Sequence, residues 1–134
     1  MAGKIVVDLT NPLTADYMAL TVGHTSSAAE EISRRLPGVH VVKAFNTVFA
    51  ALLKKRAEGG EVEVPVFVAS DHGPSKETVI NLARSMGFVT IPSGPLSNAR
   101  YLEPMAELMI QFGYGLGHGD QVGFTLRNEA MTAT

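Results

Sequence analysis

The sequence predicts an α/β fold in which a parallel sheet of about four strands has helices on both faces and a long carboxyl-terminal helix. Two observations support this prediction. Short runs rich in β-branched residues alternate with segments whose apolar residues recur at helical spacing, and turn-forming residues separate them. Such alternation is typical of βαβ units, which build parallel sheets. With 134 residues and no internal repeat, we expect a single domain over residues 1–134.

The first expected strand, Lys4 to Leu9, is β-branched and ends at Thr10-Asn11-Pro12, where the proline prevents its continuation. A loop follows. Ser27 and Glu30 then have the S-x-x-E spacing of a capping box, which predicts the start of a helix. Pro37-Gly38 ends that helix.

A second strand is expected from Val39 to Phe45, a run apolar enough to be covered on both faces. It stops at a polar corner, Asn46 and Thr47, and from Val48 the pattern is helical until Gly59-Gly60. Ligands of open α/β sheets bind at the carboxyl ends of strands. This corner is therefore the first place to look for a binding site.

The carboxyl-terminal half repeats the alternation. We expect a third strand over Val62 to Ala69, a helix ending at Gly87, a short strand over Phe88 to Ile91 and a long helix from about Ser97 to Phe112. The glycine-rich tail is expected to be a loop with a short extended piece and a frayed end.

The composition excludes several classes of function. The eleven Lys and Arg residues are scattered and the net charge is −2, so no nucleic-acid partner is expected. The absence of Cys excludes disulfides, thiolate catalysis and thiolate metal sites. No apolar run approaches the roughly 20 residues that span a bilayer, and an early Asp argues against a signal sequence. We expect a soluble, cytoplasmic protein whose partners are small molecules.

Several motifs of catalysis and binding are missing. No G-x-G-x-x-G joins a strand to a helix, and the glycines of the tail follow a helix instead. The histidines lack zinc-ligand spacing, and no G-x-S-x-G elbow supports a serine nucleophile. No metal ligand and no catalytic acid, base or nucleophile is therefore predicted.

Four polar corners remain, at Thr10-Asn11-Pro12, Asn46-Thr47, Ser70-Asp71 and Ser93-Gly94-Pro95. In a fully parallel sheet all four lie on one edge, where they would form the wall of a ligand crevice. The other interpretation is that these residues only cap helices and close turns. We favour that interpretation for Ser70-Asp71, and a ligand role for Asn11 and Asn46.

The blocks KIVVDLTNPL, VVKAFNT and GPLSNAR resemble, in order and spacing, the carboxyl-terminal two-thirds of the NADP-dependent reductases of coenzyme F-420. They are also similar to the reductase domain of the STEAP metalloreductases. The resemblance implies a Rossmann-like fold, NADPH as a cofactor, and direct hydride transfer between its nicotinamide and a deazaflavin (F-420) or flavin ring. No side chain need act as an acid or base in such a transfer, because catalysis consists of positioning.

The resemblance also implies which residues bind cofactors. Residues 11 and 12 would border the nicotinamide, residues 46 to 48 would line the pocket where the rings meet, and residues 94 to 96 would lead into a helix that packs over the pocket and helps form a homodimer. These cofactor-binding residues are Asn11, Pro12, Asn46, Thr47, Val48, Gly94, Pro95 and Leu96.

The chain departs from that family in starting where the family's fourth strand starts, so its sheet is a partial Rossmann-like sheet without the glycine fingerprint. We therefore expect one of three cases: a truncated or mis-started gene product, a chain that dimerises edge to edge, or a chain whose nucleotide-binding half is a separate chain. Hydride transfer is expected only with a complementing half. The alternative function is a non-catalytic half-domain that acts as a dimerisation or interaction module through its helix at Leu102 to Ile110.

Overall fold

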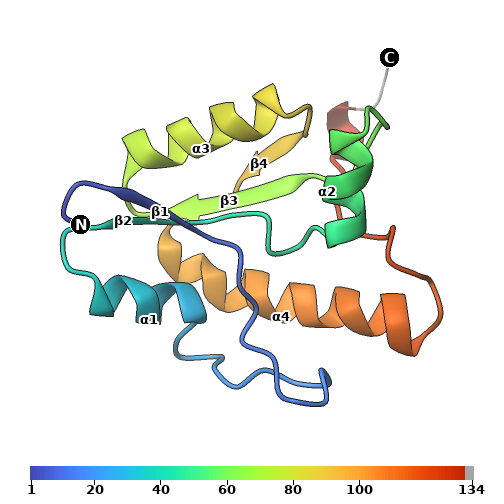
Figure 1. Ribbon diagram of the computed structural model, residues 1–134, viewed down its shortest axis with the longest axis horizontal. Coiled ribbons are helices and arrows are strands. Elements are labelled where there is room, and N and C mark those ends of the chain that lie inside the picture. Colours follow the sequence, from blue (N-terminus) through green and yellow to red (C-terminus); the bar gives the residue numbers. More distant parts are fainter. Residues whose placement is uncertain (132–134) are drawn as a thin grey trace.

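The computed structural model describes residues 1–131, which form a sheet with helices packed around it (Figure 1). Strands and α-helices alternate along the chain as predicted. In order they are β1 (Ile5–Asp8), α1 (Ala28–Arg35), β2 (His40–Lys43), α2 (Ala50–Ala57), β3 (Val66–Ser70), α3 (Gly73–Ser85), β4 (Thr90–Pro92) and α4 (Ala99–Ile110).

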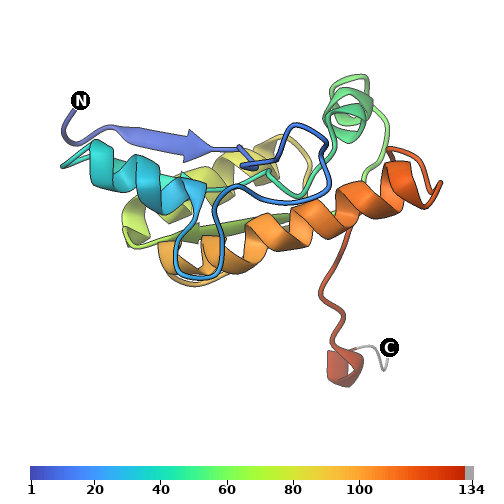
Figure 2. The same ribbon diagram turned by 90° about the horizontal axis from the view of Figure 1, so that it is seen from below.

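The four strands lie side by side in the order β1-β2-β3-β4. β1 pairs with β2 in parallel, from Ile5 opposite His40 to Asp8 opposite Lys43, and β3 pairs with β4 in parallel. Helix α3 covers one face of the sheet, and α1 and α4 cover the other (Figures 1 and 2). The predicted fold class, a mostly parallel sheet with helices on both faces and a long carboxyl-terminal helix, is confirmed.

The central pair of strands differs from the prediction, because β2 and β3 are antiparallel, with Val42 opposite Ser70. A parallel connection needs a crossover helix that carries the chain back along the sheet. Helix α2 has only 8 residues and lies beyond the end of the sheet, where β3 begins (Figure 1). The expectation that all four strand ends share one edge is therefore wrong: the carboxyl ends of β3 and β4 lie opposite those of β1 and β2.

Apolar side chains form a core on each face of the sheet. Val42, from the middle of β2, packs with α3 residues such as Val79 and Ile80, and its neighbour Val41 packs on the other face with Ala29 of α1. This alternation follows from the two-residue period of a strand. Because β2 is buried on both faces, the corner at Asn46 and Thr47 that follows it has a fixed starting point in the core.

The helix boundaries also reflect local sequence signals. The Ser27 hydroxyl accepts a hydrogen bond from the Glu30 N–H, as the capping-box spacing predicts. Helix α4 is preceded by a 3₁₀ turn at Leu96–Asn98 and continued by a π-helical turn at Gln111–Gly115. The predicted extended piece in the tail does not form a strand within the described residues, which end in a 3₁₀ turn, Glu129–Met131. No helix in residues 1–131 has the length and apolar character needed to cross a membrane.

Candidate functional site

A cavity of about 750 Å³ opens at the carboxyl ends of β1 and β2. Three segments surround it: the loop after β1, the corner after β2, and the carboxyl-terminal end of α4 with its π-helical turn. The lining residues are Asn11, Leu13, Asp16, Tyr17, Met18, Asn46, Val48, Phe49, Ala50, Met109, Ile110, Gln111, Tyr114 and Gly115. Its volume and mostly apolar lining, with a few convergent polar groups, are typical of a small-molecule site.

The floor of this pocket is shaped by an unusual turn at the end of β2. Phe45 has φ of 66°, a left-handed conformation that bulky residues rarely adopt. The turn is held because the Phe45 ring is buried and packs edge-on against Phe88, with centroids 5.9 Å apart. Backbone strain of this kind often occurs at functional sites. Here it directs Asn46 towards α4.

The Asn46 side chain joins the three segments around the pocket. Its amide nitrogen donates to Asn11 Oδ1 at 3.1 Å and to the Leu102 carbonyl at 3.0 Å, while Asn11 Nδ2 donates to the Asn46 carbonyl at 2.9 Å. Within residues 1–131, neither Asn46 Oδ1 nor the buried Thr47 Oγ1 has a hydrogen-bonding partner. Buried polar atoms without partners are uncommon, and Asn46 Oδ1 is such an acceptor in a residue that lines the pocket.

The loop after β1 forms one wall of the pocket. A bridge between Leu13 and Leu20 closes it, and its tip is held by Asp16, which accepts hydrogen bonds from Thr14 Oγ1 at 2.6 Å and from the Met18 N–H at 3.0 Å. These bonds, that from Thr14 foremost, lower the pKa of Asp16 below its ordinary value. The loop thus keeps a charged carboxylate at its tip and presents Tyr17 and Met18 to the cavity.

The opposite wall is the end of α4. Gly113 lies in the π-helical turn, where an added Cβ would be 2.7 Å from the Gly119 carbonyl and 3.0 Å from the Phe49 ring. The absence of a side chain lets Phe49 pack directly on the turn, and its ring meets that of Tyr114 edge-on, with centroids 5.5 Å apart. Short π-helical segments are frequent at functional sites. Here the turn supports two of the aromatic rings around the cavity.

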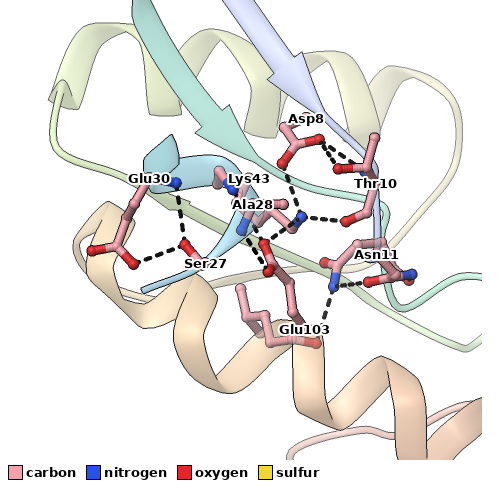
Figure 3. Close-up of polar contacts among 11 residues, drawn as sticks. Asp8, Thr10, Asn11, Ser27, Ala28, Glu30, Lys43 and Glu103 are labelled. Atoms are coloured by element: carbon pink, nitrogen blue, oxygen red, sulfur yellow. Dashed lines mark hydrogen bonds and ion pairs between the residues drawn. The ribbon is translucent and has the colours of Figure 1, made fainter. Parts of the chain in front are cut away.

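Behind the pocket lies a buried charged cluster (Figure 3). The Lys43 ammonium donates to Asp8 Oδ2 at 2.9 Å, to Glu103 Oε2 at 2.8 Å and to the Thr10 carbonyl. All three ionisable side chains are buried. The two Glu103 oxygens also accept the N–H groups of Ala28 and Ala29 at the start of α1, where the helix dipole favours a negative charge.

The predicted site residues fall into two groups in space. Asn11, Asn46 and Val48 line the pocket, and Pro12 and Thr47 adjoin them in the chain. Thr47 is fully buried, and the Pro12 carbonyl accepts hydrogen bonds from Thr21 within the loop.

Gly94, Pro95 and Leu96 do not line this pocket. They lie at the opposite end of the sheet, because β3 and β4 run against β2. The Gly94 carbonyl accepts a hydrogen bond from Lys76 Nζ at 2.9 Å, and Leu96 packs in the core with Val41. The three residues lead into α4, as expected, and the far end of α4 reaches the pocket. The residues themselves are remote from the pocket.

Sequence reasoning missed most of the apolar lining and the charged cluster. The pocket side chains come from a loop and from a helix end, where no periodic pattern distinguishes a lining residue from a core one. The cluster did leave a signal, because Lys43 interrupts the apolar run of β2 and Asp8 ends that of β1. Lys and Asp are rarely fully buried unless paired.

Among residues 1–131, no group of three or more His, Cys, Asp or Glu side chains could hold a metal ion. His40 and His72 stack at the other end of the sheet, with ring centroids 3.6 Å apart. His72 Nδ1 accepts the Ser75 N–H and caps α3, and the exposed Asp71 binds the Leu96 N–H. The preference for a capping role at Ser70-Asp71 agrees with these contacts.

No protein-family model matches the chain. Two curated proteins are similar to it over 103 residues, or 77% of its length: metalloreductase STEAP3 of Rattus norvegicus, with 36% identity, and metalloreductase STEAP2 of Homo sapiens, with 30% identity. A crystal structure from Arthrobacter sp. FB24, assigned as an F420-dependent NADP-reductase, is 32% identical and matches 95% of this chain with a TM-score of 0.81. The chain is thus related in sequence to these reductases over most of its own length.

A second solved structure, the hypothetical protein SMa0349 from Sinorhizobium meliloti, covers 73% of the chain with 31% identity and a TM-score of 0.63. The resemblance inferred from VVKAFNT and GPLSNAR is thus confirmed at the level of this reductase family. The chain spans about one fifth of the length of the curated relatives and 59% of the Arthrobacter chain.

Proposed function

We propose that this chain forms the ring-binding part of an NADP-dependent oxidoreductase, in which hydride passes between NADPH and a deazaflavin (F-420) or flavin. The observation that carries the proposal is the 750 Å³ apolar pocket at the carboxyl ends of β1 and β2, in a relative of proteins named as NADP and metal reductases. NADPH, when bound, supplies the hydride.

The residues around the pocket suit flat, uncharged rings. Tyr17, Phe49 and Tyr114 offer aromatic surfaces, Met18 and Met109 offer adaptable apolar ones, and the pocket-lining residues include no Lys, His or Cys. The single acid among them, Asp16, already accepts two bonds within its loop. Hydride transfer between two aligned rings needs no proton donor, so this lining fits catalysis by positioning.

Asn11 and Asn46 are the polar groups that would orient a ring. Flavin, deazaflavin and nicotinamide each carry an amide edge with an N–H donor, and Asn46 Oδ1 is an acceptor without a partner in the described chain. The sequence has no G-x-G-x-x-G, so we expect the pyrophosphate of NADPH to depend on a complementary nucleotide-binding segment.

The test is a fluorescence titration of the purified chain with FMN, with an oxidised deazaflavin and with NADPH. We expect saturable binding of at least one ring compound, and at least a tenfold loss of affinity in Asn46→Ala. The matched control is Asn98→Ala, whose amide binds the Ser93 carbonyl at the other end of the sheet and should leave affinity unchanged. Equal affinity in both variants, or no binding of any ligand, would contradict the proposal.

A second candidate function is that of an interaction module that pairs two copies of the chain. Tyr101 and Leu108 lie seven residues apart, two turns along α4, and are 73% and 49% exposed. Leu102, Ala106 and Met109 of α4 are buried within the chain itself, so on this helix a homodimer would use the outer stripe of Tyr101 and Leu108. Light scattering of wild type and Leu108→Glu tests it: a dimer that becomes a monomer supports pairing, and a monomeric wild type contradicts it.

A further inference from the structure

Lys43 contacts the pocket only indirectly. Its side chain is fully buried and is absent from the cavity lining. Its ammonium group nevertheless binds oxygens from three different segments: Asp8 at the end of β1, Thr10 in the loop that follows, and Glu103 in α4 (Figure 3). One cation therefore holds together the strand, the loop and the helix that surround the cavity.

Both pocket asparagines are linked to this cluster, Asn11 through the chain and Asn46 through a hydrogen bond. Thr10, whose carbonyl binds Lys43, directly precedes Asn11. Glu103 directly follows Leu102, whose carbonyl accepts the Asn46 amide at 3.0 Å. Because Asn11 and Asn46 also bond to each other, the contacts form a closed ring from Lys43 through both pocket amides and back.

The charges of the cluster argue for a role beyond filling the core. One ammonium and two carboxylates are buried together, and the excess negative charge is balanced by N–H groups of α1 and by the Thr10 N–H and hydroxyl, both bound to Asp8 Oδ1. Apolar residues of similar volume are often as stable as a buried ion pair, or more so. What an apolar side chain would not do is fix three oxygens at set positions.

We infer that Lys43 is a positioning residue for the pocket: by fixing the Thr10 carbonyl and the Glu103 carboxylate, it holds Asn11 and Asn46 in the geometry that receives the ring. This inference rests on the proposed function, since it takes the cavity to be a ring site. Transfer between two rings depends steeply on their alignment, so loss of the tether is expected to affect binding and rate together.

The test compares Lys43→Met with the double variant K43M/E103Q, using FMN as the probe. The single variant leaves two buried carboxylates without a cation, and we expect it to unfold more easily and to bind FMN at least tenfold more weakly. The double variant carries the same net cluster charge as wild type, so its melting temperature should largely recover. Because the Thr10 tether is still missing, FMN affinity should remain at least tenfold below wild type.

A double variant that binds FMN as wild type does would overturn the inference, because Lys43 would then act only through stability. Lys54→Met is the matched control: Lys54 is an exposed lysine of α2, and its replacement should change neither stability nor affinity.

A second measurement needs no ligand and separates this inference from the proposed function. Hydrogen exchange of the Asn11 and Asn46 side-chain amides, followed by NMR, should be at least tenfold faster in K43M/E103Q than in wild type. If the double variant does not fold, Asp8→Asn, which keeps the Lys43–Glu103 pair, should accelerate exchange at Asn11 by a smaller factor. Unchanged exchange overturns the inference. A wild type that binds no FMN contradicts the proposed function alone, and the exchange rates then decide the role of Lys43.

Discussion

The two ends of the sheet carry similar polar residues but use them differently. At the end where β3 and β4 stop, the Ser70 hydroxyl donates to the Val41 carbonyl at 2.8 Å and Asp71 accepts the Leu96 N–H at 3.0 Å, so the side chains serve the fold. At the other end, Asn46 Oδ1 and Thr47 Oγ1 have no partner in the described chain.

The two ends of the sheet also differ in the size of the cavity beside the polar residues. The hollow beside Ser70 and Asp71 measures about 260 Å³, against about 750 Å³ beside Asn11 and Asn46. The corner at Asn46 is the candidate site because its side-chain acceptor has no partner in the described chain and aromatic side chains surround the neighbouring cavity. Residue type alone does not distinguish the two cases.

The largest expected difference in stability is between variants of two lysines that each bind a carbonyl just after a strand. Lys43 binds the Thr10 carbonyl, and Lys76 binds the Gly94 carbonyl. Lys43→Met removes the cation that pairs with two buried carboxylates in the described chain, and should lower the free energy of unfolding by about 3–5 kcal/mol. Lys76→Met removes one half-buried hydrogen bond and should cost about 1 kcal/mol or less. Urea denaturation of both variants measures the difference. Similar losses of unfolding free energy would show that the buried charged cluster contributes no more to stability than the single hydrogen bond of Lys76.

The next effect concerns the packing beneath the pocket. In Gly113→Ala the new methyl group would be 2.7 Å from the Gly119 carbonyl, so the turn must shift, at a cost of about 1–3 kcal/mol. Gly115→Ala, two residues later, meets nothing within 4 Å and should change stability by less than about 0.5 kcal/mol. Thermal unfolding compares them. Equal melting temperatures would mean that Phe49 does not depend on the bare backbone of Gly113.

A third pair of variants, one at each end of the sheet, should change the free energy of unfolding in different directions. Thr47→Val replaces a buried hydroxyl that has no partner in the described chain, and should be neutral or stabilising by up to about 1 kcal/mol. Ser70→Ala removes the bond to Val41 and should destabilise by about 1–2 kcal/mol. Chemical denaturation gives both values, and a destabilised Thr47→Val would show that its hydroxyl serves the fold, as that of Ser70 does.

The smallest effect is expected at the ion pair between Glu30 of α1 and Arg100 of α4, whose closest atoms are 2.8 Å apart. Burial raises the pKa of Glu30, but the hydrogen bonds from Arg100 and Ser27, with the charges of Arg100 and Arg34, outweigh it and lower the pKa below its ordinary value of 4.5.

Because the folded pKa is lowered, this stabilisation is present above about pH 4.5 and is lost as the pH falls through the folded pKa. Glu30→Gln should therefore lower the free energy of unfolding by at most about 1 kcal/mol at pH 7, and the difference from wild type should shrink in acid. Denaturation at pH 7 and below pH 4 tests this, and a difference that grows in acid would contradict it.

The sequence by itself determined the elements. The β-branched runs ending at Asp8 and Lys43, the capping box at Ser27 and Glu30 and the apolar spacing of α4 depend on neighbours in the chain, and each led to the element that forms. The position of Asn11 and Asn46 beside the pocket was also predictable, because each lies three residues after the end of one of two neighbouring parallel strands.

Only the tertiary structure decided the direction of β3, and with it the separation of Gly94 to Leu96 from the pocket. Strand direction depends on where α2 comes to lie relative to the sheet, which a local pattern does not encode. The pocket walls and the burial of Lys43 likewise depend on contacts between residues far apart in sequence, such as Lys43 with Glu103 and Asn46 with Leu102. Periodicity reports which face of an element is buried, but the partner that covers that face is set by the packing of the whole chain.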